Sequence, residues 1–452
     1  MAVRFPFHYA IILAESAIMG IQASGVRTAE APSWARRHPR SEHNFAHHAR
    51  IRHQFVHGAL FFGRCHATIL ARSKTKFTGV MMTGFLHFGG WRLRVVAAAL
   101  MVIVLGAAGL VPAYAGPIGG IETFAVVPAD PGFPEGIVVH GNNVFVSGPA
   151  RFGTAGTGPS AIQVYNRKSG ALEQTIVVTG EALAYEHAVS NIAVDSAGRL
   201  YALSTQLGLI RFRKQGHAYV QEGYGAPVPD LPTCAVAPPG DPCAPTTIDY
   251  PAIVNDVVFD SQGNAYVTDS LQATIWRYPA GGGAPQIWFQ SAALEGGGFL
   301  PFGPNGIRVN PQGTHVYFVA STSLANPAQG TIYRLPLVAH PSASDLAVFH
   351  TYPSFELPDQ LAFGARGDLV VSLAMSNQIS VLAPNGTESA RFSSAVGDAV
   401  PLDNPAGIAF DARTKSLLIV NHALLSGNPA HFAVLQMALG DPGAPLFAPV
   451  LP

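Results

Sequence analysis

From residue 116 to the end of the chain, apolar and polar positions alternate in short paired runs. Each pair begins at a small or polar residue, continues as an alternating apolar stretch, passes through a turn that usually holds Asp or Asn and Gly, and ends in a second apolar stretch. This pattern predicts a β-hairpin. It recurs six times, and the copies begin at Glu135, Ser190, Asn255, Asn305, Asp359 and Ala406.

A further strand-like run, such as residues 274–279 or 331–336, follows most of the hairpins. Three or four strands in units 47 to 65 residues apart are typical of propeller blades. We therefore predict an all-β fold, a six-bladed β-propeller over residues 116–452. Residues 121–127 form one more strand, which we expect to supply the outer strand of the last blade and so close the ring. The alternative, a pair of β-sandwiches, does not explain why the six hairpins begin at equivalent positions.

Composition agrees with a turn-rich β protein, since the chain has 47 Gly, 36 Pro and only 12% charged residues. Its net charge of zero hides an uneven distribution. Residues 1–80 hold 11 Lys or Arg against 3 acidic groups, whereas residues 116–452 hold 14 against 24. The predicted propeller is therefore acidic, which argues against a nucleic-acid partner.

The N-terminal third has the features of an export signal. Basic residues 92 and 94 precede an apolar run over 95–111, and Ala113-Tyr114-Ala115 forms a cleavage site. We predict a signal peptide over 81–115, with an uncleaved membrane anchor as the alternative. Residues 1–80 then precede the signal, and we interpret them as a leader that is either unstructured or the result of a start site assigned too far upstream. The mature protein is expected to be secreted or periplasmic, without stable membrane insertion.

Cysteine usage fits export. Cys65 would be lost on processing, which leaves Cys234 and Cys243 in a loop rich in Pro and Gly. In an oxidising compartment we expect these two residues to form a disulfide, and the alternative is two free thiols.

The first residues of the six hairpins carry the candidate chemistry. In a propeller this position starts the innermost strand, so the six side chains should meet around the central tunnel. Ser, Asn and Asp also suit turns, but two carboxylates and two amides at equivalent positions are better explained by a cation site. Hard oxygen ligands without Cys favour Ca²⁺ over Zn²⁺ or Mg²⁺.

These residues also resemble a known family. Pro134-Glu135-Gly136, Asn255-Asp256, Asn305-Gly306 and Pro358-Asp359 are similar, in the same order, to signatures of the SMP-30/gluconolactonase/LRE family. The resemblance implies a six-bladed propeller hydrolase that depends on Ca²⁺ or another divalent ion. It implies Glu135, Asn305 and Asp359 as metal ligands, Asp359 also as the catalytic residue, and Asn255 with Asp256 as substrate-binding residues.

Two departures from the family pattern stand out. Gln360 follows Asp359 where the family has Gly, and Ser372-Leu373-Ala374 stands where related phosphotriesterases have Asn and His. The second departure argues against phosphotriester hydrolysis. His187 and His422 lie near predicted strand ends, where each is either a proton shuttle or a structural residue.

The function expected from the resemblance is hydrolysis of a sugar lactone or similar cyclic ester, and we expect a monomer that acts on a small molecule. The alternative is a non-catalytic propeller of the NHL or YVTN kind that binds a protein or glycan, because residues 264–269 resemble a YVTN repeat. A strictosidine-synthase-like propeller is a third possibility that does not need the carboxylates.

Overall fold

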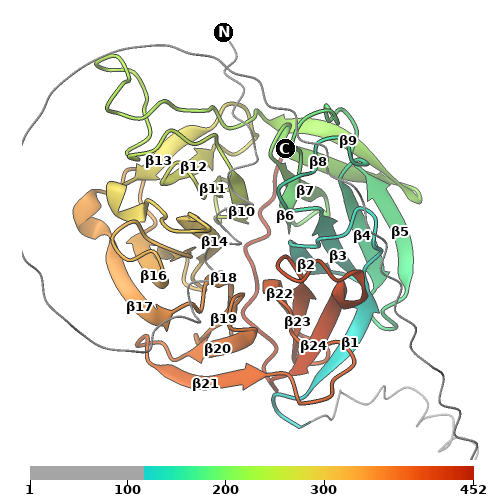
Figure 1. Ribbon diagram of the computed structural model, residues 1–452. Helices are drawn as coiled ribbons and strands as arrows, with labels where there is room; N and C mark the ends of the chain where they lie inside the picture. The colour runs from blue at the N-terminus through green and yellow to red at the C-terminus, as the bar shows by residue number, and fades with distance from the viewer. Residues whose placement is uncertain (1–116) are drawn as a thin grey trace, which may run out of the picture. The chain divides into compact units, whose positions relative to one another are not determined.

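The computed structural model describes residues 117–452, which form six four-stranded antiparallel sheets arranged around a central axis (Figure 1). The predicted six-bladed propeller is confirmed. The predicted leader, the signal peptide and Cys65 lie outside the described residues. Within residues 117–452, no helix has the length and apolar character needed to cross a membrane.

Each of the first five blades is built from four consecutive strands, innermost strand first. Their bounds are β2 Ile137–His140, β3 Asn143–Gly148, β4 Ala161–Asn166 and β5 Leu172–Val177; β6 Val189–Val194, β7 Leu200–Ser204, β8 Gly208–Gln215 and β9 Ala218–Gly225; β10 Val254–Phe259, β11 Ala265–Asp269, β12 Thr274–Tyr278 and β13 Gln286–Gln290; β14 Pro304–Val309, β15 His315–Ala320, β16 Gln329–Pro336 and β17 Ala347–Ser354; β18 Pro358–Phe363, β19 Leu369–Leu373, β20 Gln378–Leu382 and β21 Glu388–Ser393.

The sixth blade closes the ring. It contains β22 Pro405–Asp411, β23 Ser416–Asn421 and β24 Ala433–Ala438, and its outer strand is β1, Ile121–Val126. β1 pairs antiparallel with β24, so the start and the end of the propeller share one sheet (Figure 1). This pairing confirms the expected closure and covers an edge of the sheet that would otherwise be open. Three short 3-10 turns lie between strands, at Ala292–Leu294, Ala343–Asp345 and Pro429–His431.

Turn chemistry explains the repeated Asp or Asn after the inner strand. Oδ1 of Asp195 accepts the backbone N–H groups of residues 197 and 199, and Oδ1 of Asp260 accepts those of 262 and 264. These side chains replace backbone partners within the turn. Gly198 and Gly263 complete the two turns at φ of 75° and 89°, a region that favours glycine. The local sequence thus fixes each hairpin and its register.

The apolar core is divided into layers between neighbouring blades. One cluster joins Phe145 of the first blade to Leu200 of the second, and another joins Tyr201 of the second to Trp276 of the third. Trp288 packs between the third and fourth blades. The inner strands are buried on both faces, and all six residues of β14 are buried. The ring therefore needs no single central core.

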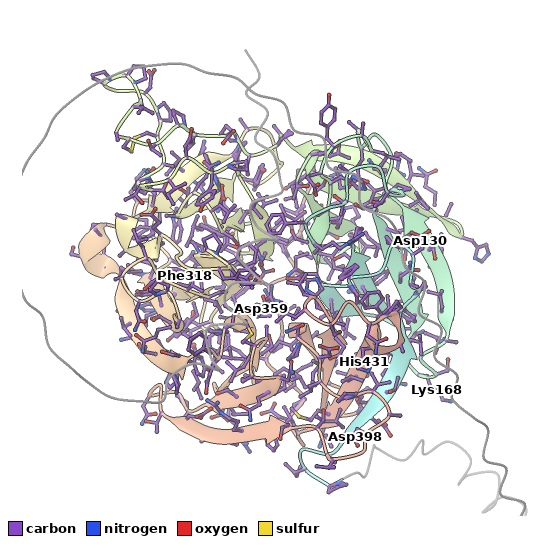
Figure 2. All side chains as sticks on the ribbon, in the orientation of Figure 1. Asp130, Lys168, Phe318, Asp359, Asp398 and His431 are labelled. Carbon is purple, nitrogen blue, oxygen red and sulfur yellow. A yellow bond between two sulfur atoms is a disulfide. The ribbon has the colours of Figure 1, made fainter. Side chains whose placement is uncertain are left out.

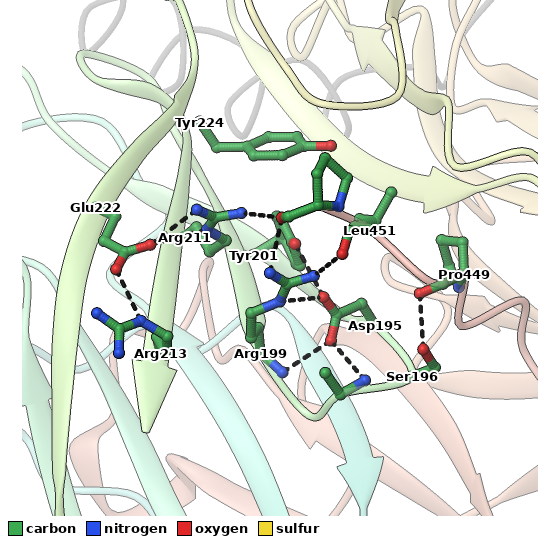
Figure 3. A network of polar contacts seen from close by, with 12 residues as sticks. Asp195, Ser196, Arg199, Tyr201, Arg211, Arg213, Glu222, Tyr224, Pro449 and Leu451 are labelled. Carbon is green, nitrogen blue, oxygen red and sulfur yellow. Dashed lines mark hydrogen bonds and ion pairs between the residues drawn. The ribbon is translucent and has the colours of Figure 1, made fainter. Parts of the chain in front are cut away.

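Two segments outside the blades cover opposite ends of the ring. The predicted disulfide Cys234–Cys243 is present in the loop before β10, at the end where inner strands begin. The segment after β24 lies at the other end, against the turns that follow the inner strands. There Ser196 donates to the carbonyl of Pro449, and Arg199 and Arg211 both donate to the carbonyl of Pro452 (Figure 3).

Candidate functional site

The first residues of the inner strands gather at one end of the ring. Glu135 lies just before β2, Asn255 in β10, Asn305 in β14 and Asp359 in β18, so four blades contribute one side chain each. Asp359 lies near the middle of the ring in Figure 2. Glu135, Asn305 and Asp359 are buried, with 4%, 4% and 8% of their surface exposed, and Asn255 is half-buried.

These four residues share an uncommon property. Oε2 of Glu135 and Oδ1 of Asn255, Asn305 and Asp359 are each buried and lack a hydrogen-bond partner within residues 117–452. Buried polar atoms are normally paired, because an unpaired one loses its hydration without compensation. These four oxygens, which come from four blades and make no hydrogen bond within residues 117–452, are therefore a candidate cation site at one end of the ring, although Oε2 of Glu135 also lies 2.6 Å from Nδ1 of His422.

Electrostatics connects two of these residues. Burial and the negative charge of Glu135 hold the pKa of Asp359 well above its ordinary value, while the amide of Asn305 acts in the opposite sense. The two carboxyl groups therefore share one electrostatic environment. Two carboxylates placed together in a buried site repel each other, and a bound cation is one way to relieve that repulsion.

The donor set fits a hard divalent cation. Two carboxylates and two amide carbonyls are oxygen ligands of the kind that Ca²⁺ takes. Within the described residues, no three His, Cys, Asp or Glu side chains come together as a metal-binding group. A site here would therefore depend on the two Asn carbonyls as well as on Glu135 and Asp359.

Asp256, predicted to bind substrate, has a different environment. It is fully buried, and its Oδ1 accepts from Asn191 Nδ2 at 2.5 Å while its Oδ2 accepts from Arg308 Nη1 at 2.5 Å and from the N–H of Ile307 at 2.7 Å. Burial raises its pKa, and Arg308 opposes that shift. Both oxygens accept hydrogen bonds, so Asp256 connects three inner strands, and its role in substrate binding stays a prediction.

Arg308 and Asn191 are functional-site neighbours that the sequence analysis did not identify. A signal was present for Arg308, because a charged residue interrupts the apolar run of an inner strand. A charged side chain on an inner strand either faces the central tunnel or pairs with a buried group of opposite charge. For Asn191 no comparable signal exists, because Asn is common near strand entries.

Gln360 and Ser372 occupy the positions where the sequence departs from the family pattern. Gln360 is fully buried, and neither atom of its amide has a hydrogen-bond partner within residues 117–452. A Cβ on Gly306 would lie 3.0 Å from Oε1 of Gln360, which places this amide against β14. Ser372 donates to the carbonyl of Ala406 at 2.7 Å and so joins the fifth and sixth blades.

The two histidines have distinct surroundings. Nδ1 of His422 lies 2.6 Å from Oε2 of Glu135, at ion-pair distance but without hydrogen-bond geometry, and its Nε2 is buried without a partner in the described chain. His422 therefore borders the candidate site. His187 contacts backbone carbonyls through both ring nitrogens, Tyr185 and Gly158 each at 2.9 Å, which is a structural role.

Comparisons with known proteins identify one matching family. The model of the SMP-30/Gluconolactonase/LRE-like region matches residues 186–422. No curated protein matches the chain. Among solved structures, a calcium-binding regucalcin from Agrobacterium tumefaciens is 16% identical, with a TM-score of 0.50 over 74% of this chain and 98% of that one.

Two further solved structures are similar over most of the propeller. A gluconolactonase from Xanthomonas campestris is 16% identical, with a TM-score of 0.40 over 72% of this chain and 99% of that one. A virginiamycin B lyase from Staphylococcus aureus is 15% identical, with a TM-score of 0.45 over 71% and 99%. At these identities the likeness concerns the fold alone. The family model, however, spans more than half of the chain, and the chain therefore belongs to the SMP-30/gluconolactonase/LRE-like family.

Proposed function

We propose that this protein is a metal-dependent hydrolase that opens a sugar lactone or a similar cyclic ester. The observation that carries the proposal is that Glu135, Asn255, Asn305 and Asp359 each have a buried oxygen without a hydrogen bond in the described residues. Membership of a family that includes gluconolactonase in its description supports the lactonase type. The calcium-binding regucalcin among similar structures is consistent with a divalent cation.

Glu135, Asn305 and Asp359 would hold the cation, with Asn255 as a further ligand or as a contact to the substrate. A divalent cation in this position supplies a Lewis acid that polarises the ester carbonyl and stabilises the negative charge formed during attack. Ca²⁺ is the preferred ion, because all candidate ligand atoms are hard oxygens.

Asp359 would act on water. Its carboxylate would accept a proton from a water molecule aligned with the carbonyl carbon, through an oxygen lone pair that does not bind the cation. Water oxygen bonds to that carbon, the bond from the carbonyl carbon to the ring oxygen breaks, and the proton passes to the released oxygen. The product is a hydroxy acid, with no other reactant required.

Export is the second part of the proposal. The disulfide Cys234–Cys243 is of the kind that persists in oxidising compartments. Together with the signal peptide predicted over 81–115, it supports a secreted or periplasmic protein. N-terminal sequencing of the exported product should find a chain that starts at Gly116, and a product that retains residues 1–80 would contradict this part of the proposal.

A panel of lactones and carboxylic esters, assayed with and without added Ca²⁺, tests the activity. We expect calcium-dependent turnover of at least one lactone. Asp359→Asn should lower kcat by about 100-fold or more, because general base catalysis contributes on that order. Glu173→Gln, on the exposed outer strand β5, is the matched control and should keep full activity. No turnover of any lactone or ester would instead favour the non-catalytic binding propeller.

A further inference from the structure

A loop of the first blade reaches the candidate site. Residues 149–160 connect β3 to β4, and they lie at the end of the ring where β2 begins, because β3 runs antiparallel to β2. The N–H of Ala150 donates to the carbonyl of Phe133, two residues before Glu135. Oε2 of Glu186 accepts from the N–H groups of Gly153 and Thr154 at 2.9 and 3.0 Å. The loop is therefore fixed beside the site.

Arg151 in this loop has no polar partner. Its guanidinium carbon lies 4.4 Å from the centroid of the Phe133 ring, and its Nε is buried. No side chain or carbonyl within residues 117–452 forms a hydrogen bond or ion pair with it. Other partly buried arginines are paired, as Arg167 is with Asp411 and Arg391 with Glu356. A half-buried guanidinium with its donors unused is suited to bind an acceptor on a ligand.

Phe133 connects Arg151 to the candidate cation site. The Phe133 ring also packs against the ring of Phe432, with centroids 4.9 Å apart, and meets the imidazole of His422 edge-on, with centroids 6.1 Å apart. His422 in turn lies against Glu135. The guanidinium therefore lies at the same end of the ring as Glu135. One phenyl ring and one imidazole ring lie between the two groups.

Two aromatic side chains meet at this end of the propeller. Phe152 follows Arg151 in the first blade, and Phe302 precedes β14 in the fourth blade, which lies opposite the first among the six blades. Their rings stack with centroids 6.0 Å apart and planes inclined by 16°. Because they come from opposite blades, the pair spans the end of the ring that carries the candidate ligands. The pair therefore supplies apolar surface at this end of the ring, and Arg151 directly precedes one of its two members in the chain.

We infer that Arg151 binds an anionic group of the substrate, and that the substrate is a lactone or ester carrying a carboxylate. This inference rests on the function proposed above. A monoanionic carboxylate fits better than a phosphate dianion, because the guanidinium brings a single positive charge and no second cationic side chain pairs with this loop in the described residues.

Binding of benzoate, compared with its neutral analogue benzamide, tests the inference without turnover. Titration calorimetry is carried out on the calcium-saturated protein and repeated after chelation, since benzoate can also contact a bound cation. We expect the parent protein to bind benzoate at least about tenfold more tightly than benzamide, as a charge-assisted pair should provide. Arg151→Met should weaken benzoate binding about tenfold and leave benzamide unchanged, with Arg151→Lys in between.

Arg334→Met is the matched control, because Arg334 is an exposed arginine on β16 that also lacks an ion pair within the described chain. It should bind both probes as the parent does. Equal benzoate affinity for the parent and Arg151→Met, or no benzoate binding by the parent, would overturn the inference.

Kinetics separates this inference from the proposed function. If neutral lactones are hydrolysed and Arg151→Met leaves KM for carboxylate-bearing lactones unchanged, the function stands and the inference fails. If Arg151 governs benzoate binding but no lactone is hydrolysed, the anion site stands and the hydrolase proposal fails. We expect Arg151→Met to raise KM for the anionic substrate about tenfold and to change kcat little.

Discussion

Arg308 on β14 donates from Nη1 to Oδ2 of Asp256 on β10 at 2.5 Å, and Asp256 directly follows the candidate ligand Asn255. Their side chains are only 8% and 0% exposed. The same carboxylate accepts from Asn191 on β6, so the pair braces three consecutive inner strands. Asn255 directly precedes Asp256 in the chain, and Asn305 lies close to Arg308. The positions of both candidate ligands therefore depend on this hydrogen-bonded pair.

Removing Arg308 should destabilise the propeller strongly. Arg308→Met leaves a buried carboxylate without its partner, and the expected loss is about 3 to 5 kcal/mol of unfolding free energy. Adding Asp256→Asn should recover part of that loss. Urea unfolding of the parent and the variants measures both effects. As the control, Arg366→Met breaks an ion pair of 3.7 Å whose arginine is 82% exposed. It should cost less than about 1 kcal/mol, and an equal loss in both single variants would contradict the brace.

Asp269 should make stability depend on pH. Burial raises its pKa to about 6, from an ordinary value of 3.8. Between these two values the folded protein keeps a proton that the unfolded chain has released, so stability falls as pH rises from about 4 to about 6. The shift corresponds to roughly 3 kcal/mol.

Urea unfolding at several pH values, for the parent and for Asp269→Asn, measures this dependence. The variant cannot titrate at this position, so its unfolding free energy should fall less over the same window. Other buried carboxyl groups contribute equally to both proteins, which is why the difference is the relevant quantity. Identical slopes for the two proteins would show that Asp269 does not hold its proton in the fold.

The segment after β24 should contribute to stability through one side chain. Leu451 is 7% exposed and packs into the cluster between the second and third blades, beside the Arg199 network shown in Figure 3. Leu451→Ala should cost about 2 to 4 kcal/mol, as for other buried leucines. Its neighbour Val450 is 89% exposed. Val450→Ala should therefore leave the thermal unfolding midpoint nearly unchanged, and similar shifts for both variants would argue against this docking.

The propeller could be predicted because its signals are local. Each hairpin contains its own alternation and its own Asp or Asn turn, as at Asp195 and Asp260, so the repeat reveals the blades without knowledge of distant contacts. Closure of the ring by residues 121–126 could also be predicted, because this strand precedes the first hairpin and belongs to none of the six repeats. Periodicity is a reliable signal when every unit repeats it.

The site was only partly predictable. The four oxygens without hydrogen bonds belong to residues that begin hairpins in the repeat. They could be predicted because equivalent positions of a propeller meet around its axis. The partner of Asp256 is 52 residues away, and the stack of Phe152 on Phe302 joins opposite blades. No local pattern records such pairs. Asp256 was predicted as a substrate residue from the Asn-Asp signature, and no signal in the sequence indicated that its carboxylate pairs with Arg308 and Asn191.

Calcium titration of the dialysed, metal-free protein tests the central claim most directly. Isothermal calorimetry should show one divalent ion bound per chain, with Glu135→Gln and Asp359→Asn each weakening binding by about tenfold or more, because each removes a charged ligand. Glu173→Gln should bind as the parent does. Absence of any saturable Ca²⁺, Mg²⁺ or Mn²⁺ binding by the parent, or unchanged affinity in both ligand variants, would contradict a cation held by the four oxygens.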